Sequence, residues 1–146
     1  MVRSGRMAEK KKKKRKGITA KAKKKAAVAR AVIKKGSGIV KINNRNIETY
    51  QPALIYEFIR EPLDLAEDVA KEVNISISVN GGGFMGQAVA ARAAIAKSIL
   101  EFRPNEKLKK KFLAYDRMLL VDDSRRVESK KPLGPKARKK KQKSKR

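Results

Sequence analysis

Apolar and polar residues alternate in several stretches of the chain, a pattern typical of β-strands with one covered face. Residues 26–35 and 39–42 both alternate, and the Gly-Ser-Gly turn at 36–38 separates them, so we predict that the two strands form a hairpin. A short third strand is predicted at 47–50. The clearest alternation is Val-Asn-Ile-Ser-Ile-Ser-Val at 73–79.

Apolar residues at helical spacing follow Pro52. A proline favours the first turn of a helix, so we predict that a helix begins there and that Pro62 interrupts it. A second helical segment is predicted at 63–71. Its acidic residues Asp64, Glu67 and Asp68 would lie near its positively polarised start.

A long helix is predicted from Gln87 to Leu100, after the loop Gly-Gly-Gly-Phe-Met-Gly, because an apolar stripe recurs with helical spacing. Pro104 should end it, and Asn105 can cap a last helix that reaches Tyr115. These elements predict an α/β fold, a small two-layer sandwich of about four strands with the helices on one face.

Positive charge is concentrated at the two ends of the chain. The 146 residues include 40 Lys and Arg against 14 Asp and Glu, a net charge of +26. Residues 1–25 carry +12, residues 125–146 carry +11, and the span between them carries only +3. We therefore predict a basic N-terminal arm (1–25), a globular RNA-binding domain (26–120) and an extended basic tail (121–146), with arms that a polyanion would order.

The residue types exclude several classes of chemistry. The chain has no Cys and no His, which removes disulfides, thiolate nucleophiles and imidazole bases. The uncharged stretch 73–91 contains too many Asn, Ser, Gln and Gly residues for a membrane span, and a lysine run takes the place of a signal-peptide core. We expect a soluble, cytoplasmic protein without a metal, a cofactor or a catalytic residue. A Mg²⁺ site or an acid–base pair is conceivable for the carboxylates, but helix starts and an ion pair of Asp122 and Asp123 with Arg125 and Arg126 account for them better.

The glycines Gly81, Gly83 and Gly86 spell G-x-G-x-x-G between a predicted strand and a predicted helix, which is the setting of a dinucleotide site. Such a site also needs an acid at the end of the next strand, and Glu101 has the spacing but ends the same helix. A loop without side chains also lets backbone amides approach a phosphate closely. Because the chain is so basic, we expect the phosphate bound by this loop to belong to an RNA backbone and not to a nucleotide cofactor.

Base stacking on exposed aromatic side chains is not expected. The seven aromatic residues considered have core spacing rather than paired positions on a strand. They are Tyr50, Tyr56, Phe58, Phe84, Phe102, Phe112 and Tyr115.

Four sequence blocks together resemble a known family. They are KAKKKAAVARAVIKKGSGIVKINNR at 21–45, EPLDLA at 61–66, GGGFMGQAVAARAAIAKSIL at 81–100 and the terminal block at 115–146 that ends QKSKR. The chain resembles the universal ribosomal protein nine family of the small subunit, in its archaeal or eukaryotic-like form. The resemblance implies a sandwich like the second domain of ribosomal protein five, with a left-handed crossover, bound to ribosomal RNA in the small-subunit head. It also implies head proteins as neighbours and a C-terminal tip at peptidyl-site transfer RNA.

The charge pattern and the resemblance predict the contact residues. For ribosomal RNA they are Lys23, Lys24, Lys25, Arg30, Arg45, Gly81, Gly82, Gly83, Gly86, Gln87, Arg92, Arg117, Arg125, Arg126, Lys130, Lys131, Lys136 and Arg138. For transfer RNA they are Ser144, Lys145 and Arg146.

Two features depart from the family. Ala22 and Ala26 stand where it usually has Gly and Thr around the first basic cluster, and the lysine block at 10–16 is additional. A solvated tail, a localisation signal and a nonspecific DNA contact all remain open for that block. For the whole chain, two alternatives are a chromatin or nucleoid protein with basic arms and a nucleotide-dependent enzyme that uses the glycine loop.

Overall fold

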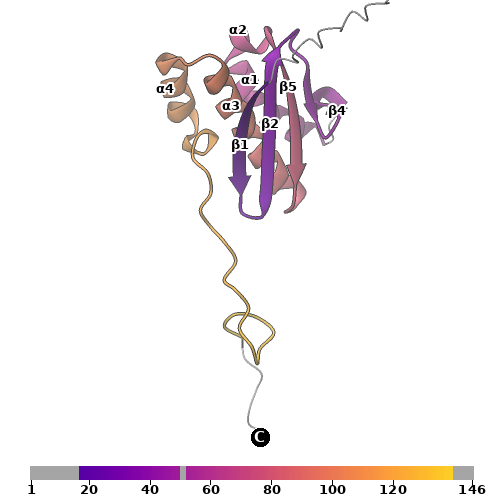
Figure 1. Ribbon diagram of the computed structural model, residues 1–146, viewed down its shortest axis with the longest axis vertical. Coiled ribbons are helices and arrows are strands. Elements are labelled where there is room, and N and C mark those ends of the chain that lie inside the picture. The colour runs from indigo at the N-terminus through magenta and orange to yellow at the C-terminus, as the bar shows by residue number, and fades with distance from the viewer. Residues whose placement is uncertain (1–16, 50–51, 140–146) are drawn as a thin grey trace, which may run out of the picture.

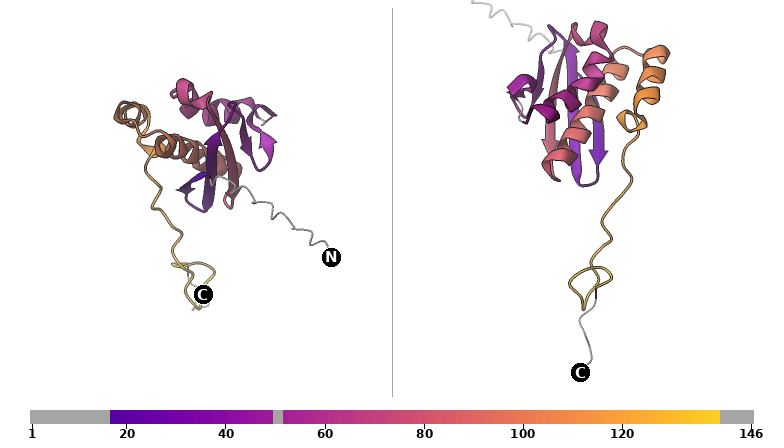
Figure 2. Two further views of the ribbon diagram at one scale, coloured as in Figure 1. Left: turned by 45° about the horizontal axis from the view of Figure 1, so that its top comes forward. Right: turned by 180° about the vertical axis from the view of Figure 1, so that it is seen from behind.

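The fold is that of a computed structural model, which describes residues 17–49 and 52–139. Five strands form one sheet, and the helices cover one of its faces, which lies behind the strands in Figure 1 and in front in the right view of Figure 2. The strands are β1 (Ile18–Lys24), β2 (Ala27–Lys35), β3 (Val40–Ile42), β4 (Arg45–Asn46) and β5 (Val73–Asn80). The helices are η1 (Ile47–Thr49), α1 (Ala53–Asp64), α2 (Glu67–Ala70), α3 (Phe84–Phe102), α4 (Glu106–Tyr115) and η2 (Arg117–Leu119). The predicted α/β two-layer architecture is confirmed.

The strand order is β1-β2-β5-β3-β4. β2 pairs antiparallel with β1 and with β5, whereas β3 runs parallel to β5. The chain between β3 and β5 contains α1 and α2, so those helices form the crossover that a parallel pair requires. None of the helices in the described part of the chain is long and apolar enough to span a membrane.

Strand β1 corrects the predicted boundary between the N-terminal arm and the domain. Ile18–Lys24 lies within the stretch assigned to the arm (1–25), yet it pairs along its length with β2. Its inward-facing residues Ala20 and Ala22 are buried. The four lysines among residues 21–25 obscured this short apolar alternation.

The predicted hairpin of β2 and β3 is wrong, because β5 lies between them. The hairpin partner of β2 is β1, which the sequence did not identify as a strand. The predicted strand at 47–50 is also wrong, because residues 47–49 form the 3₁₀-helix η1. The short β3–β4 hairpin precedes it, and its turn residues Asn43 and Asn44 have positive φ angles of 47° and 66°, as primed hairpin turns require.

Helix α1 runs through Pro62 instead of ending there. Pro62 lies in the last turn of α1 and is buried. A proline has no amide donor, so the helix lacks one backbone hydrogen bond there, and the burial of the proline ring in the core offsets this loss. The second helix is shorter than predicted: α2 spans only Glu67–Ala70, with Glu67 and Asp68 in its first turn as expected. Asp64 ends α1 instead of beginning the next helix.

Helix α3 begins at Phe84, three residues before the predicted start, and ends before Pro104. Asn105 caps α4 as predicted, because its side chain accepts a hydrogen bond from the Lys107 amide at 3.0 Å.

The core lies between the sheet and the helices. The alternation predicted for β5 is confirmed, since Val73, Ile75, Ile77 and Val79 are all buried. In β2 the alanines and Ile33 point inward, and α3 packs on β1 and β2. Because α3 is itself rich in alanine, small side chains on both surfaces let helix and sheet approach closely. No helix among residues 17–49 and 52–139 covers the opposite face of the sheet (Figure 1).

Candidate nucleic-acid interface

Three segments that are far apart in sequence meet at one end of the sheet. They are the turn between β1 and β2, the glycine loop before α3, and the root of the C-terminal arm. Together they line a hollow of about 920 Å³. Its lining residues are Lys23, Lys24, Lys25, Ala26, Gly82, Gly83, Met85, Gly86, Val89, Arg125, Arg126 and Val127. The fold therefore gathers eight of the eighteen predicted ribosomal RNA contacts, three lysines, three glycines and two arginines, into one concave surface.

The glycine loop folds closely against the β1–β2 turn. Gly81 and Gly82 have φ angles of 75° and 66°, in the left-handed region that favours glycine. A Cβ atom on Gly81 would lie 2.6 Å from the Ala26 carbonyl oxygen, and one on Gly82 would lie 3.0 Å from the Ala27 Cβ. The Gln87 side chain donates to the Gly81 carbonyl at 3.2 Å, which fixes the loop from inside. These two glycines and Gln87 therefore serve the fold itself.

Gly83 and Gly86 differ from the first two glycines. Gly83 precedes the first residue of α3 with an ordinary φ of −98°, and a Cβ atom there would meet no atom within 4 Å. On Gly86, inside α3, the nearest contact of a Cβ would be an ordinary 3.6 Å. No side chain caps the start of α3, so its first amides remain available to an external acceptor. Nothing within the described protein requires glycine at either position.

The root of the arm is held to the β1–β2 turn by Asp123, which is buried. Its carboxylate accepts hydrogen bonds from the Arg125 amide at 2.9 Å and from the Arg125 guanidinium, and Lys24 Nζ lies 3.3 Å away. The Arg125 guanidinium and amide, followed by Lys24, hold the pKa of Asp123 well below its usual value of 3.8. Of the predicted ion pairs, that of Asp123 with Arg125 is confirmed, whereas Asp122 pairs with Lys97 and not with Arg125 or Arg126. Asp123 is fully committed to neighbouring cations.

Asp122 makes a second attachment of the arm. Its carboxylate accepts from the Lys23 amide at 3.2 Å and from Lys97 Nζ at 2.6 Å. The backbone continues the contact, because the Asp123 amide donates to the Lys23 carbonyl at 3.3 Å. The arm therefore leaves the domain from a fixed position beside β1 and then extends away from it (Figure 1).

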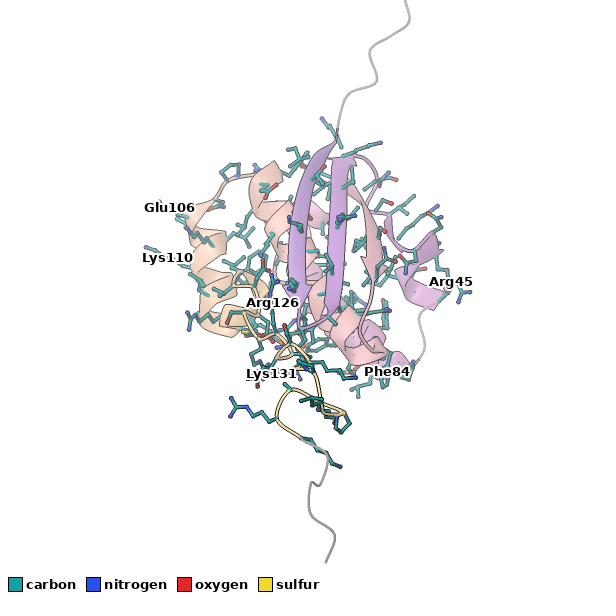
Figure 3. The ribbon with its side chains drawn as sticks, turned by 60° about the horizontal axis from the view of Figure 1, so that its bottom comes forward. Arg45, Phe84, Glu106, Lys110, Arg126 and Lys131 are labelled. Atoms are coloured by element: carbon teal, nitrogen blue, oxygen red, sulfur yellow. The ribbon has the colours of Figure 1, made fainter. Side chains whose placement is uncertain are left out.

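Exposed apolar side chains accompany the cations of this region. Phe84 is 71% exposed, Met85 45% and Val127 96%. Figure 3 shows Phe84 and Arg126 near the same end of the sheet. The sequence predicted core spacing for Phe84, and that prediction is wrong. The sequence could have indicated this exposure, because Phe84 follows three glycines directly. In the structure it begins α3, and no other described element covers it.

Comparison with known proteins identifies the family. A sequence model described as ribosomal protein S9/S16 matches residues 22–146. The chain belongs to the ribosomal protein S9/S16 family. The small ribosomal subunit protein uS9 of Thermoplasma volcanium is 49% identical over 122 residues, which cover 84% of this chain and 92% of that protein. The uS9 proteins of Picrophilus torridus and Thermoplasma acidophilum are 47% and 49% identical over 84% of this chain, and cover 92% and 95% of their own lengths.

Membership settles several sequence-based expectations. The predicted family, in its archaeal-like form, is confirmed. This family consists of structural ribosomal proteins, so the chain is not an enzyme, and it functions in the cytoplasmic ribosome. The G-x-G-x-x-G spacing is therefore not a dinucleotide fingerprint in this ribosomal protein.

Arg92 does not lie on the RNA-accessible surface that the sequence predicted for it. Its guanidinium lies 2.6 Å from the Glu61 carboxylate and 2.9 Å from that of Asp116, and its side chain is 7% exposed. It also lies over the rings of Phe58, at 4.3 Å, and Tyr115. Helical spacing placed Arg92 off the apolar stripe, but α1 and the start of η2 cover that side of α3. Arg92 therefore joins elements within the domain.

The remaining predicted residues lie apart from the hollow. Arg30 is exposed on the face of the sheet that carries no helix, Arg45 is exposed in β4, and Arg117 is exposed in η2. Lys130, Lys131, Lys136 and Arg138 are exposed along the arm. Of these, Arg138 and Lys131 approach Glu128 at 2.8 and 3.6 Å. The predicted transfer RNA contacts at 144–146 lie outside the described residues, as does the lysine block at 10–16.

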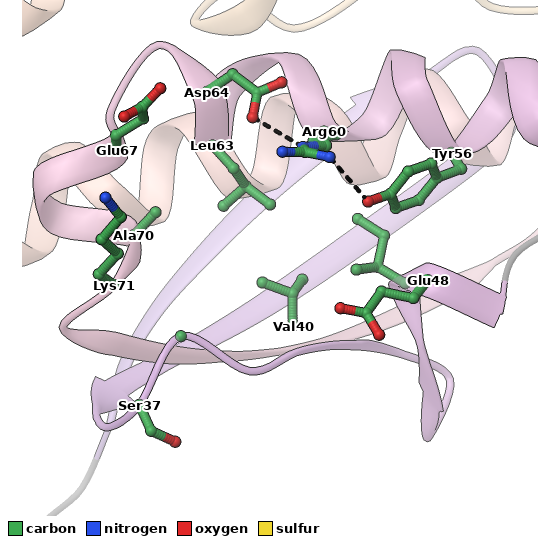
Figure 4. A pocket seen from close by; sticks show the side chains of 12 residues that line it. Ser37, Val40, Glu48, Tyr56, Arg60, Leu63, Asp64, Glu67, Ala70 and Lys71 are labelled. Carbon is green, nitrogen blue, oxygen red and sulfur yellow. Dashed lines mark hydrogen bonds and ion pairs between the residues drawn. The ribbon is translucent and has the colours of Figure 1, made fainter.

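A second hollow, of about 560 Å³, has a small excess of negative charge, because three acidic residues line it against the two cations Arg60 and Lys71. It lies between β3, α1 and α2, and Glu48, Asp64 and Glu67 are among its lining residues (Figure 4). Its Arg60 is held at 2.9 Å by Asp64 and at 3.2 Å by the Tyr56 hydroxyl. These carboxylates would repel RNA phosphates, so the candidate interface is the hollow beside the glycine loop.

Proposed function

We propose that this protein binds small-subunit ribosomal RNA in the head of the subunit and that its C-terminal tip contacts peptidyl-site transfer RNA. The observation that carries the first part is the cationic hollow in which Lys23–Lys25, Arg125 and Arg126 surround the uncapped start of α3. The names of the uS9 relatives give the subunit. The protein acts by binding RNA segments noncovalently and holding them together, and it catalyses no reaction.

The residues of the hollow favour the RNA backbone as the contact. Lysine ammonium groups and free backbone amides neutralise and hydrogen-bond phosphate oxygens, and they do not distinguish one base from another. Arg126 has no ion-pair partner among the described residues, so its guanidinium fork can bind a phosphate with two hydrogen bonds. The glycines at 83 and 86 leave room for a strand of RNA to approach the helix start.

The contact with transfer RNA rests on the extended arm and on the family resemblance. The described part of the arm, residues 121–139, extends away from the domain (Figure 2). From Ser129 to Arg146 the chain has 18 residues, which would reach on the order of 60 Å if the turns that residues 132–138 form were straightened. Such reach allows a domain anchored on ribosomal RNA to place its last residues at a separate ligand.

A substitution at Gly83 tests the RNA interface. Gly83→Val should fold normally, because φ is ordinary and the added side chain would enter open space. It should weaken binding to a transcript of the small-subunit head RNA about tenfold or more, the effect of losing one or two charge-assisted hydrogen bonds. Ala53→Val, at the exposed start of α1, is the matched control and should bind normally. Equal affinities for all three proteins would refute the proposed role of the helix start.

Deletion of residues 144–146 tests the transfer RNA contact. The deletion removes two side-chain cations of 40 basic residues, so assembly into subunits should continue. Transfer RNA should dissociate faster from the peptidyl site of assembled subunits at matched Mg²⁺ and salt. If the dissociation rate stays the same, the tip has no such contact and this part of the proposal is withdrawn.

A further inference from the structure

The face of the sheet that carries no helix has an unusual set of side chains. Five of the residues that point to it from β1, β2, β3 and β5 are cationic, and no residue that points to it from these strands is acidic. The cations are Lys21, Lys23, Arg30, Lys34 and Lys41. Figure 1 shows this face toward the viewer, with β1, β2 and β5 in front of the helices.

Two of these cations are direct cross-strand neighbours. Lys21 in β1 is paired in register with Arg30 in β2, and both residues are exposed. Side chains that lie directly opposite on an antiparallel pair are about 4.5–5.5 Å apart at Cβ, and like charges there destabilise the sheet. Neither cation has an ion-pair partner within residues 17–49 and 52–139. The free protein therefore contains an uncompensated repulsion on this face.

A shortage of acidic residues does not explain the repulsion. Seven of the 14 acidic residues lie between positions 48 and 72, in and around η1, α1 and α2. An ordinary solvated strand would place some acids opposite its lysines, because such pairs stabilise a sheet. The separation of the two charge signs onto different surfaces indicates that the sheet face meets a polyanion in the assembled state.

The same face contains a hollow of about 300 Å³ next to these cations. Its lining residues are Ala26, Val28, Arg30, Ser78, Asn80 and Gly81. Ser78 lies opposite Arg30 on the side away from Lys21, so Lys21, Arg30 and Ser78 form a row across β1, β2 and β5. A serine hydroxyl and an asparagine amide can bind phosphate or ribose hydroxyl oxygens without adding charge.

This surface is continuous with the glycine-loop interface. Ala26 lines both hollows, and the glycine run contributes Gly81 to one and Gly82 to the other. No residue that points outward from β1, β2 or β5 is aromatic, so the face offers no platform for stacking bases. Cations and small polar groups on a flat surface instead suit the sugar–phosphate backbone and the ribose hydroxyls of a helix groove.

From these observations we propose that the open sheet face formed by β1, β2 and β5 is a second RNA-binding surface, which contacts the ribose–phosphate backbone through Lys21, Arg30 and Ser78. This proposal rests on the proposed function. It adds to the glycine-loop interface a second surface, so that the RNA-binding surface continues around the β1–β2 turn onto the open sheet face. An RNA strand on this face replaces the repulsion of Lys21 and Arg30 with two attractive contacts.

The central test measures stability and RNA affinity in the same full-length variant. Lys21→Gln/Arg30→Gln should keep or raise the melting temperature of the free protein, because it removes a repulsion. It should weaken binding to the head RNA transcript about tenfold or more, and lower the salt slope by about 1.4–1.8 for two lost phosphate contacts. The control Lys107→Gln/Lys110→Gln removes the same charge from α4, which lies away from the sheet face (Figure 3), and should change affinity less than threefold.

A second variant protects the test against a failure to fold. Ser78→Glu places a carboxylate opposite Arg30, so it should raise the melting temperature through a new cross-strand ion pair while lowering RNA affinity about tenfold or more. Ala114→Glu, exposed on α4, is its matched control. Hydroxyl-radical footprinting, which reports on riboses, should lose one discrete protected strand in both sheet variants, while base-specific chemical modification should not change.

The outcomes separate this proposal from the function on which it rests. Sheet variants that bind like their α4 controls, while Arg125→Gln/Arg126→Gln binds weakly, would overturn the sheet surface and leave the glycine-loop interface intact. Normal binding by all of these variants would overturn both. A loss of protection at base edges would show that the face reads bases, which also contradicts the proposal.

Discussion

The guanidinium of Arg92 donates to the carboxylate of Asp116 at 2.9 Å and thereby joins the middle of α3 to the residue that caps η2. The Asp116 side chain also accepts from the Met118 amide at 2.8 Å. Glu61 of α1 completes the arrangement on the other side of the guanidinium. A single buried cation therefore fixes three elements that the sequence separates.

Replacing Arg92 should destabilise the domain severely. Arg92→Met leaves Glu61 and Asp116 without their cation, at a cost of about 2–4 kcal/mol in the free energy of unfolding, since both carboxylates keep some contact with solvent. Arg92→Lys should recover only part of it, because an ammonium lacks the planar fork that serves two carboxylates and stacks on Phe58. Urea unfolding of the free protein measures both. A loss below 0.5 kcal/mol for Arg92→Met would contradict the structural role.

The pKa of Asp123 predicts how the root of the arm responds to acid. Hydrogen bonds from Arg125 hold that pKa below 3.8, so the stability contributed by the carboxylate is complete above pH 3.8 and is lost as pH falls through the lower, folded-state pKa. No change is expected near neutral pH. Carbon NMR of the side-chain carboxyl should show Asp123 still ionised at pH 3.8, where an ordinary aspartate is half protonated.

Asp123→Asn should loosen the arm root without unfolding the sheet. The amide cannot form the ion pairs with Lys24 and Arg125, so amide hydrogens of residues 121–125 should exchange faster while those of β2 and β5 do not. Glu128→Gln, farther along the arm, is the control. Unchanged exchange at the root would mean that the backbone contacts to Lys23 suffice.

Alanine substitutions at Gly82 and Gly86 should have opposite effects on the free energy of unfolding. Gly82→Ala should cost about 1–3 kcal/mol, because it adds a Cβ at a positive φ and against Ala27. Gly86→Ala should stabilise the free protein by about 0.5–1 kcal/mol, since alanine favours the helix and its Cβ has room. Thermal unfolding distinguishes them. If Gly86→Ala is more stable than the wild type and yet binds head RNA more weakly, then glycine occupies position 86 because RNA approaches the backbone closely there.

Removal of residues 1–16 should weaken RNA binding without moving the binding site. The deletion takes away nine basic residues and one acid, which act collectively on phosphates. Affinity should fall for all RNA sequences and the salt slope should decrease, while the protected positions stay the same. Loss of one discrete protected site would show that this segment has a specific partner.

The sequence predicted the local elements better than their pairing. Alternation identified β2 and β5 correctly because each has one apolar face. β1 was missed because lysines on its outer face dominated its composition, and with it the hairpin partner of β2 was lost. The position of β5 between β2 and β3 depends on long-range packing, which no local pattern encodes.

The candidate site was predicted as a set of residues rather than as a place. Charge and glycine spacing indicated Lys23–Lys25, the loop and Arg125, but their convergence at one end of the sheet follows only from the fold. Arg92 was assigned to RNA because its charge is visible in the sequence, whereas its partly buried carboxylate partners Glu61 and Asp116 are identified only by the fold. The open sheet face was missed because it needs the register of β1 against β2.

The contact between Lys23 and Asp122 joins positions 99 residues apart, so the cationic hollow exists only while the domain is folded. The basic runs at the chain ends keep their charges in any conformation. A ligand that requires the hollow binds the native state alone and raises the melting temperature by mass action, whereas a ligand attracted by charge alone also binds the denatured chain and raises it less. Heating the protein with its own RNA and with an unrelated polyanion would therefore divide its affinity into a part that depends on shape and a part that depends on charge.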